Sequence, residues 1–197
     1  ALYDLLDREQ PETDLRTATV NALMQRFAVD TAHAERVAAT ACALFRQAAA
    51  PGSERAERKL EWAAKLHEVG CRISHSDYHR HGAYILDNTD AAGFALPELH
   101  RLGILVLGQR GKVRKLEADL SDASFALQLI CLRLAVALCH ARRAPDITEM
   151  QLLMEPGTFT LKIPSRWPQA FPQSAHLLQE EMVAWQKTPW ELRVLAD

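Results

Sequence analysis

An apolar stripe within residues 121–143 restricts the fold of this chain more than any other feature. Its members recur about every 3.6 residues, the period of an α-helix: Phe125, Leu129, Leu132, Val136 and Cys139. A helix with such a stripe has to bury it against other elements. Alanine and leucine, at 31 and 28 of 197 residues, enter helices at little cost, whereas strands favour β-branched residues. The chain is therefore predicted to be mainly α, which argues against an all-β sandwich or a regular parallel sheet.

Capping residues, glycines and prolines divide the first part of the chain into a series of predicted helices. These helices span about 13–27, 30–49, 53–69, 76–88, 96–107 and 121–143. We expect the first helix to begin at a Thr13 or Asp14 cap and the last to end before Pro145. Residues 1–144 are thus predicted to form one helical domain.

The pattern changes after Pro145, where short strands replace most of the helices. The predicted elements are strands over 150–154 and 158–163, a helix over 174–187 and a closing strand over 190–195. Residues 145–197 are too few to hold a core alone. We therefore expect a small C-terminal β-α-β appendage, an α+β subdomain that packs on the helical domain.

Charge, hydropathy and cysteine usage limit the surroundings in which this chain works. Its formal net charge of −2 gives no general reason to bind nucleic acid. No apolar run approaches the ~20 residues that span a bilayer, and no signal peptide opens the chain. Its four cysteines form no CxxC pair, which favours buried free thiols over disulfides or a zinc site. We expect a cytoplasmic protein without a transmembrane segment.

Two histidines, His33 and His67, fall on the apolar faces of their predicted helices. Such residues are either core histidines that hydrogen-bond to backbone carbonyls or carboxylates, or metal ligands. The order of His33, then His67-Glu68 in "LHEVG", then "HRHGAYIL" and "LRLAVAL" resembles the HD superfamily of helical phosphohydrolases. That resemblance implies a metal held by a His, a His-Asp pair and a distant Asp. Here Glu68 stands where the paired Asp belongs, and Val136, on the predicted buried stripe, corresponds to the distant Asp. We therefore expect no metal ligands and no stoichiometric transition metal.

A closer resemblance extends over about residues 1–143. The strings "LYDLL", "RFAVDTAHAERVAATACALFRQ", "LHEVGCRISHSDYHRHGAYILDNTDAAGF" and "LGQRGKVRKL" resemble the C-terminal half of the exopolyphosphatase and guanosine pentaphosphate phosphohydrolase family. The tail after Pro145 is similar to the end of the longer family members. The family implies an N-terminal half with an actin-like ATPase fold, a glycine-rich phosphate-binding motif and the catalytic carboxylate. This chain contains neither the glycine-rich phosphate-binding motif nor the segment with the catalytic carboxylate, and it begins at Ala1 without methionine. We therefore expect a piece cut from a longer protein, with no catalytic residues of its own.

Basic side chains gather in two short segments of the sequence. Between Leu99 and Leu116 there are five cations and no Asp or Glu, and a second segment around Asp77 contains further basic residues. Arginine offers forked donors to phosphate oxygens and lysine a point charge. The alternative is a solvated face whose cations complement a helix C-terminus. The predicted polyphosphate-binding residues are Arg110, Lys112, Arg114, Lys115, His79, Arg80 and His81.

The leading hypothesis is that the chain is the polyphosphate-binding and dimerisation part of an exopolyphosphatase, a hydrolase of phosphorus anhydrides. Its expected partners are inorganic polyphosphate, its own N-terminal catalytic half and a second copy, and Mg²⁺ is expected for the whole enzyme. The chain alone is expected to lack catalytic activity. Three alternatives remain open: the same part of a guanosine pentaphosphate phosphohydrolase, an autonomous HD phosphohydrolase using His33, His67 and Glu68, or a structural interaction domain. Candidate contact residues for the last are Trp62, Trp167, Trp185 and Trp190.

Overall fold

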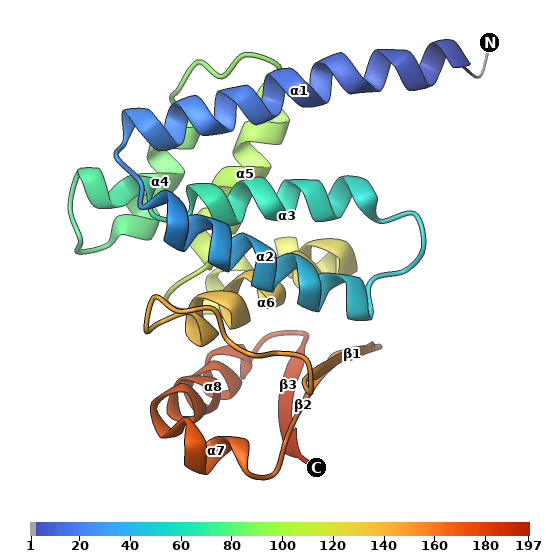
Figure 1. Cartoon of the computed structure of the whole chain (residues 1–197), viewed down its shortest axis with the longest axis vertical. Coiled ribbons are helices and arrows are strands. Elements are labelled where there is room, and N and C mark those ends of the chain that lie inside the picture. The colour runs from blue at the N-terminus through green and yellow to red at the C-terminus, as the bar shows by residue number, and fades with distance from the viewer. Residues whose placement is uncertain (1–2) are drawn as a thin grey trace.

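The computed structural model describes the backbone of residues 3–197 and the side chains of residues 15–197. The proposed cut at Ala1 lies outside the described residues. The fold is mainly α with a small C-terminal sheet, as the composition predicts. Figure 1 shows α1 at one end of the molecule, the sheet with α7 and α8 at the other, and α2, α3 and α6 between them.

The helical body, residues 3–144, contains six α-helices and three short 3-10 helices within the described residues. The α-helices are α1 (Tyr3–Arg26), α2 (Thr31–Ala48), α3 (Glu54–Leu66), α4 (Tyr78–Asp87), α5 (Leu96–Gly108) and α6 (Ala123–Leu138). The 3-10 helices are η1 (Val69–Arg72), η2 (Val113–Leu116) and η3 (Asp119–Ser121). Five of the six predicted helices correspond closely to α2–α6. The predicted cap at Thr13 or Asp14 is wrong, because α1 already begins at Tyr3 and continues through Pro11.

Helix α6 is the centre of the helical body. It packs against α2, α3, α5 and, from the tail, α8. Its residues 125–135 are buried on every side, so the single buried stripe predicted from the sequence is too narrow. Val136, by contrast, is only half-buried, which corrects its predicted burial. The helix also ends earlier than expected, because the backbone tightens at Cys139 and Arg142 takes a left-handed conformation with φ of 55°.

The tail, residues 145–197, forms the predicted strand–helix–strand unit with one additional short helix. Its elements are β1 (Gln151–Glu155), β2 (Thr158–Ile163), α7 (Trp167–Ala170), α8 (Pro172–Trp185) and β3 (Glu191–Ala196). Strands β1 and β2 form an antiparallel hairpin in which Glu155 pairs with Thr158. Gly157 supplies the positive φ of the turn, 74°. Strand β3 returns through α7 and α8 to pair parallel with β2.

Side chains from the helical body hold the tail in place. The amide of Gln47 on α2 donates to the Met150 carbonyl over 3.2 Å and accepts from the Leu152 N–H over 2.7 Å. The indole of Trp190 donates to the Leu120 carbonyl over 2.9 Å and stacks on Phe159. One apolar core therefore continues from the helices into the tail.

The tryptophans proposed as a contact surface belong to this core. Trp62, Trp167, Trp185 and Trp190 are all buried, the most exposed of them at 9%. A partner would have to unfold the chain to reach them, so they do not form a docking surface. The four cysteines are free thiols as predicted, three of them buried and Cys71 half-buried. Among the described residues no helix is both long enough and apolar enough to span a membrane.

The packing of η1 on α4 depends on Gly70. A Cβ at this position would lie 1.9 Å from the Tyr78 carbonyl oxygen and 2.6 Å from the Gly82 nitrogen. We predict that Gly70→Ala lowers the free energy of unfolding by about 2–4 kcal/mol, because backbone atoms of α4 have to move away. Urea denaturation measures this loss.

Gly103→Ala on α5 is the matched control. Its Cβ would lie 3.3 Å from the Asp87 carboxylate and at an ordinary contact distance of 3.5 Å from the Ala83 carbonyl oxygen, and alanine favours a helix over glycine by about 1 kcal/mol. We expect a change below about 1 kcal/mol for this variant. A Gly70→Ala variant as stable as Gly103→Ala would show that the close approach of η1 to α4 does not constrain the fold.

Candidate functional site

The basic loop between α5 and η2, residues 109–112, starts at a tightly packed glycine. A Cβ at Gly108 would lie 2.6 Å from Leu116 and 2.8 Å from Leu129. Gly111 then turns the chain with φ of 81°, a conformation that side chains with a Cβ rarely adopt. Val113 and Leu116 of η2 are buried, which leaves the cations of this segment exposed. The cations of this loop are therefore exposed, while the apolar residues on either side of it are packed into the core.

The second basic segment reaches the same place from α4. Helices α4 and α5 pack side by side, and Asp77, with φ of 54°, directs the chain into the first turn of α4. This turn presents His79 and Arg80 toward the loop after α5. Two segments about 30 residues apart in the sequence thus lie together.

Five of the seven predicted polyphosphate-binding residues line one pocket of about 440 Å³, here called the basic pocket: His79, Arg80, Arg110, Lys112 and Lys115. Asp77 is the only acidic residue in its lining and forms an ion pair with Arg80 over 3.7 Å. Arg110, Lys112 and Lys115 form no ion pair with any residue that the structure describes. The pocket therefore has an excess of positive charge that neighbouring acids do not neutralise.

The other two predicted residues do not line this pocket. Arg114 is exposed on η2, and His81 is half-buried on α4. Within a short helix, adjacent side chains point in different directions, so neighbours in sequence need not share a surface. The basic pocket is therefore lined by fewer basic residues than the seven predicted from the sequence.

His79 is the buried member of the basic pocket, at 8% exposure. Burial lowers the pKa of its imidazole, and Arg110 and Arg80 lower it further, while Asp77 opposes them. Its Nδ1 has no hydrogen-bond partner within the described part of the chain. A Cβ at Gly111 would lie 3.8 Å from its Nε2, so the glycine leaves the approach to this ring open.

A second pocket, of about 470 Å³, adjoins the basic pocket and shares Arg110 and Gly111 with it. Val136, the position that the HD resemblance equates with the distant Asp, lines this second pocket. The guanidinium of Arg110 lies 5.4 Å from the centre of the Tyr78 ring, and burial raises the pKa of that phenol. The second pocket is lined by a mixture of apolar, acidic and basic side chains. Its charge therefore favours no single class of ligand.

His33, His67 and Glu68 form a compact group, here called the histidine cluster. One potential ligand atom from each lies within 4.8 Å of the others. The Nδ1 of His67 donates to the Ala64 carbonyl over 2.6 Å, which leaves its Nε2 lone pair free. Burial lowers the pKa of both imidazoles, so both are neutral at neutral pH. The predicted placement of His33 and His67 on buried faces is confirmed.

The residues around the histidine cluster do not fit a resident divalent ion. Arg142 donates to Glu68 Oε1 over 3.1 Å, and the same oxygen lies 3.9 Å from His33 Nε2. A metal ion would have to share this carboxylate with a guanidinium and tolerate its charge. Val136 offers no ligand atom. The absence of a stoichiometric transition metal stays a prediction.

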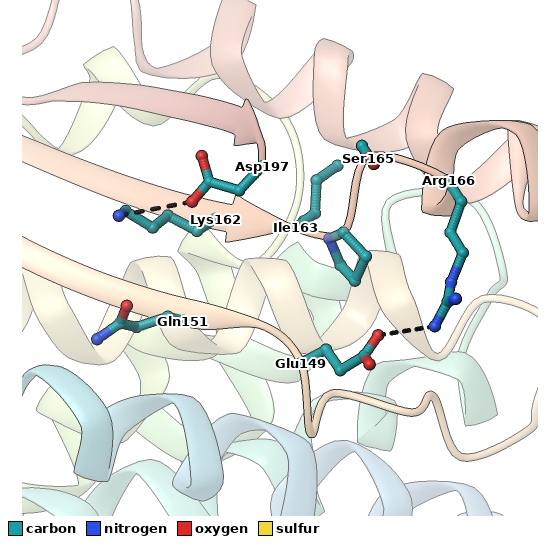
Figure 2. A pocket seen from close by; sticks show the side chains of 8 residues that line it. Glu149, Gln151, Lys162, Ile163, Ser165, Arg166 and Asp197 are labelled. Carbon is teal, nitrogen blue, oxygen red and sulfur yellow. Dashed lines mark hydrogen bonds and ion pairs between the residues drawn. The ribbon is translucent and has the colours of Figure 1, made fainter.

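A third pocket, of about 470 Å³, lies in the tail and was not predicted (Figure 2). Figure 2 shows Lys162 reaching Asp197 and Arg166 reaching Glu149, with ion-pair distances of 3.5 and 3.3 Å. Its lining comes from separate segments around β1, β2 and the end of β3, so no local motif announces it. Because its cations are paired with its acids, it is a poor site for an anion.

Comparison with known proteins identifies the family. The family model described as Ppx/GppA phosphatase, domain III, matches residues 15–183. The chain belongs to this family, as the sequence resemblance indicated, and contributes its domain III.

Three curated relatives carry the name guanosine-5'-triphosphate,3'-diphosphate pyrophosphatase. The protein from Aeromonas hydrophila is 32% identical, that from Vibrio atlanticus 31% and that from Pseudoalteromonas translucida 30%. In each case the match covers 98% of this chain but 39–40% of the relative. The chain therefore spans about two fifths of the length of these relatives.

The buried Arg133 on α6 holds the basic loop relative to the tail. It forms a two-pronged ion pair with Glu181 on α8, both bonds 2.8 Å long, and donates to the Gly108 carbonyl over 2.7 Å. We predict that Arg133→Ala lowers the free energy of unfolding by about 3–5 kcal/mol, because it leaves Glu181 charged and without its partner in a largely buried place. Thermal or urea denaturation measures the loss.

Arg193→Ala in the tail is the control, since Arg193 pairs with Glu191 over the same 2.8 Å but at the surface. Exposed pairs contribute about 0–1 kcal/mol. Equal losses for the two variants would contradict the proposed importance of the buried pair.

Proposed function

We propose that this chain is the substrate-binding part of a hydrolase of phosphorus anhydrides, and that its basic pocket holds the substrate's chain of condensed phosphates. The observation that supports this most strongly is the pocket itself, with four formal cations and His79 facing a single acid. Condensed phosphates carry about one negative charge per phosphorus, so they need several cations at separate points. The relatives' name, which denotes a pyrophosphatase of a guanosine polyphosphate, agrees with a parent hydrolase.

Each part of the basic pocket has its own role in this proposal. Arg80 and Arg110 donate paired N–H groups to phosphate oxygens, which fixes the orientation of the bound chain. Lys112 and Lys115 act as point charges that attract the polyanion and follow its movement. His79, at the buried wall, is neutral at neutral pH and becomes a further cation when protonated. None of these residues attacks phosphorus, and cleavage belongs to the rest of the parent protein.

The identity of the parent's substrate separates two versions of the proposal. The first is an exopolyphosphatase that takes long inorganic polyphosphate, which suits an open pocket lined by several cations. The second is a guanosine pentaphosphate phosphohydrolase, which the names of the relatives favour. Both substrates present condensed phosphates to the same cations. Competition between long-chain polyphosphate and guanosine pentaphosphate for this chain distinguishes the versions.

Several parts of the proposal concern the whole parent protein. We propose that a catalytic half with Mg²⁺ precedes this chain, that the parent is a cytoplasmic homodimer, and that this chain alone is not catalytic. A phosphatase assay of the chain with Mg²⁺ or Mn²⁺ tests the last point. Turnover that is lost in Glu68→Gln would favour an autonomous HD phosphohydrolase instead.

Charge reversal in the basic pocket tests the proposed function. We predict that Arg110→Glu, Lys112→Glu and Lys115→Glu together weaken binding of long-chain polyphosphate at least roughly 30-fold at low salt and flatten its salt dependence, because fewer counterions are released. Fluorescence anisotropy with end-labelled polyphosphate measures both quantities.

Two controls separate the pocket from general charge. Arg114 lies on η2, the same short helix as Lys115, but outside the pocket. We expect Arg114→Glu to weaken polyphosphate binding less than about threefold. Lys162→Glu, Arg166→Glu and Arg193→Glu change the net charge as much as the pocket variant does, but in the tail. Affinity that falls equally for the pocket and tail variants would contradict a defined site.

Binding should also depend on pH through His79. Burial lowers the pKa of the free imidazole, and a bound polyanion raises it, so a proton and the anion bind together. We predict that affinity rises as the pH falls from 7 to 5.5, since inner phosphate units stay ionised over this range. His79→Asn should remove much of this rise, although Asp77, Arg80, Arg110 and Arg133 still surround the position. An unchanged pH profile in His79→Asn would rule out this role.

A further inference from the structure

Arg142 lies in a strained turn directly after α6. Its φ of 55° is in the left-handed region, which a non-glycine residue adopts at a cost and which marks positions held by their surroundings. The Arg142 N–H donates to the Cys139 carbonyl over 2.9 Å, closing the turn. From this turn the Arg142 side chain, which stays 51% exposed, reaches carboxylates beside α2 and α3.

The guanidinium of Arg142 joins two carboxylates from different helices. One nitrogen donates to Asp30 Oδ2 over 3.0 Å and the other to Glu68 Oε1 over 3.1 Å. Asp30 is also the N-cap of α2, since its other oxygen accepts from the His33 N–H over 3.1 Å. Arg142 thus connects the start of α2, which carries His33, with the end of α3, which is followed by His67 and Glu68.

The histidine cluster next to this guanidinium has the donor chemistry of a metal site. Its two imidazoles are buried, His67 is oriented through Nδ1 by the Ala64 carbonyl, and the ligand atoms lie within 4.8 Å of one another. Two histidines and one carboxylate suit a borderline transition metal. What distinguishes the cluster from a metal site is that Arg142 already holds the Glu68 oxygen that faces His33.

We propose that the cluster of His33, His67 and Glu68 is a latent transition-metal site, which the guanidinium of Arg142 closes by acting as a built-in cation. The guanidinium neutralises Glu68 and ties α2 to α3, as a bound ion would. This differs from the metal chemistry that the HD resemblance implies, and it does not depend on the proposed function of the basic pocket.

Removal of the guanidinium should open the site. The test compares the full 197-residue chain with its Arg142→Ala variant, and the probe is Co²⁺, whose visible absorption reports coordination by nitrogen and oxygen ligands. We expect the variant to bind one Co²⁺ per chain at least tenfold more tightly than the wild type. Co²⁺ should also raise the melting temperature of the variant and leave that of the wild type unchanged.

Two further variants assign the effect. Arg143→Ala removes the same charge from an exposed neighbour and should bind Co²⁺ no better than the wild type. Adding Glu68→Gln to Arg142→Ala should abolish the gain, because an amide does not replace the carboxylate ligand. If Arg142→Ala does not fold, Arg142→Gln keeps the length of the side chain without its charge and serves the same measurements.

Two results would overturn the proposal. Wild-type protein that binds Co²⁺ through Glu68 as tightly as Arg142→Ala would show that the guanidinium does not close the site. A folded Arg142→Ala or Arg142→Gln variant that gains no affinity for Co²⁺ would show that the cluster is not a latent metal site.

Discussion

The buried contact between Arg133 and Glu181 connects the three parts of this molecule. Arg133 projects from the central helix α6, Glu181 belongs to α8 of the tail, and the third bond of the guanidinium goes to Gly108, where the basic loop begins. A buried ion pair adds little net stability compared with apolar packing, but its directional bonds allow few alternative arrangements. Arg133 therefore ties the start of the loop to both the core and the tail, alongside Gln109, which donates to the His67 carbonyl over 2.6 Å.

The pockets of this protein differ in their local charge, which the net charge of the whole chain does not reveal. The chain has a net charge of −2, and in the tail pocket the lysine and arginine each face an acid. In the basic pocket Arg110, Lys112 and Lys115 lack such partners, so their field extends into the space that a ligand would occupy. The histidine cluster shows the opposite arrangement, because Arg142 neutralises Glu68 within the protein. The same residue types thus form a group of cations without acidic partners in one place and an ion pair in another.

The sequence predicts the helices well because apolar residues recur at a helical period and glycine and proline interrupt it. The sequence-based prediction fails where contacts between distant parts of the chain determine the structure. Helix α1 continues through Pro11, and α6 is buried on every side over residues 125–135 because α2, α3, α5 and α8 pack around it. Trp190 looks available for a partner, but its ring stacks on Phe159.

The candidate site was predictable in outline only. Two basic segments could be found by counting charges, and their family resemblance pointed to phosphate. Which residues face the pocket depends on the packing of α4 on α5 and on the turn at Gly111, so the sequence could not show that His81 and Arg114 lie outside its lining. The role of Arg142 had no sequence signal beyond two adjacent arginines after a helix, because its partners Asp30 and Glu68 are far away in the chain.

Amide hydrogen exchange of the chain, with and without saturating long-chain polyphosphate, tests most directly whether the basic pocket binds condensed phosphates. N–H groups in the loop 109–112 and in the first turn of α4 lie at the pocket, and such groups exchange readily when they lack an intrahelical partner. Bound polyphosphate is predicted to slow exchange at these two segments and to leave residues 149–166 of the tail unchanged. Unchanged exchange at both segments, or slowing confined to the tail, would contradict the account.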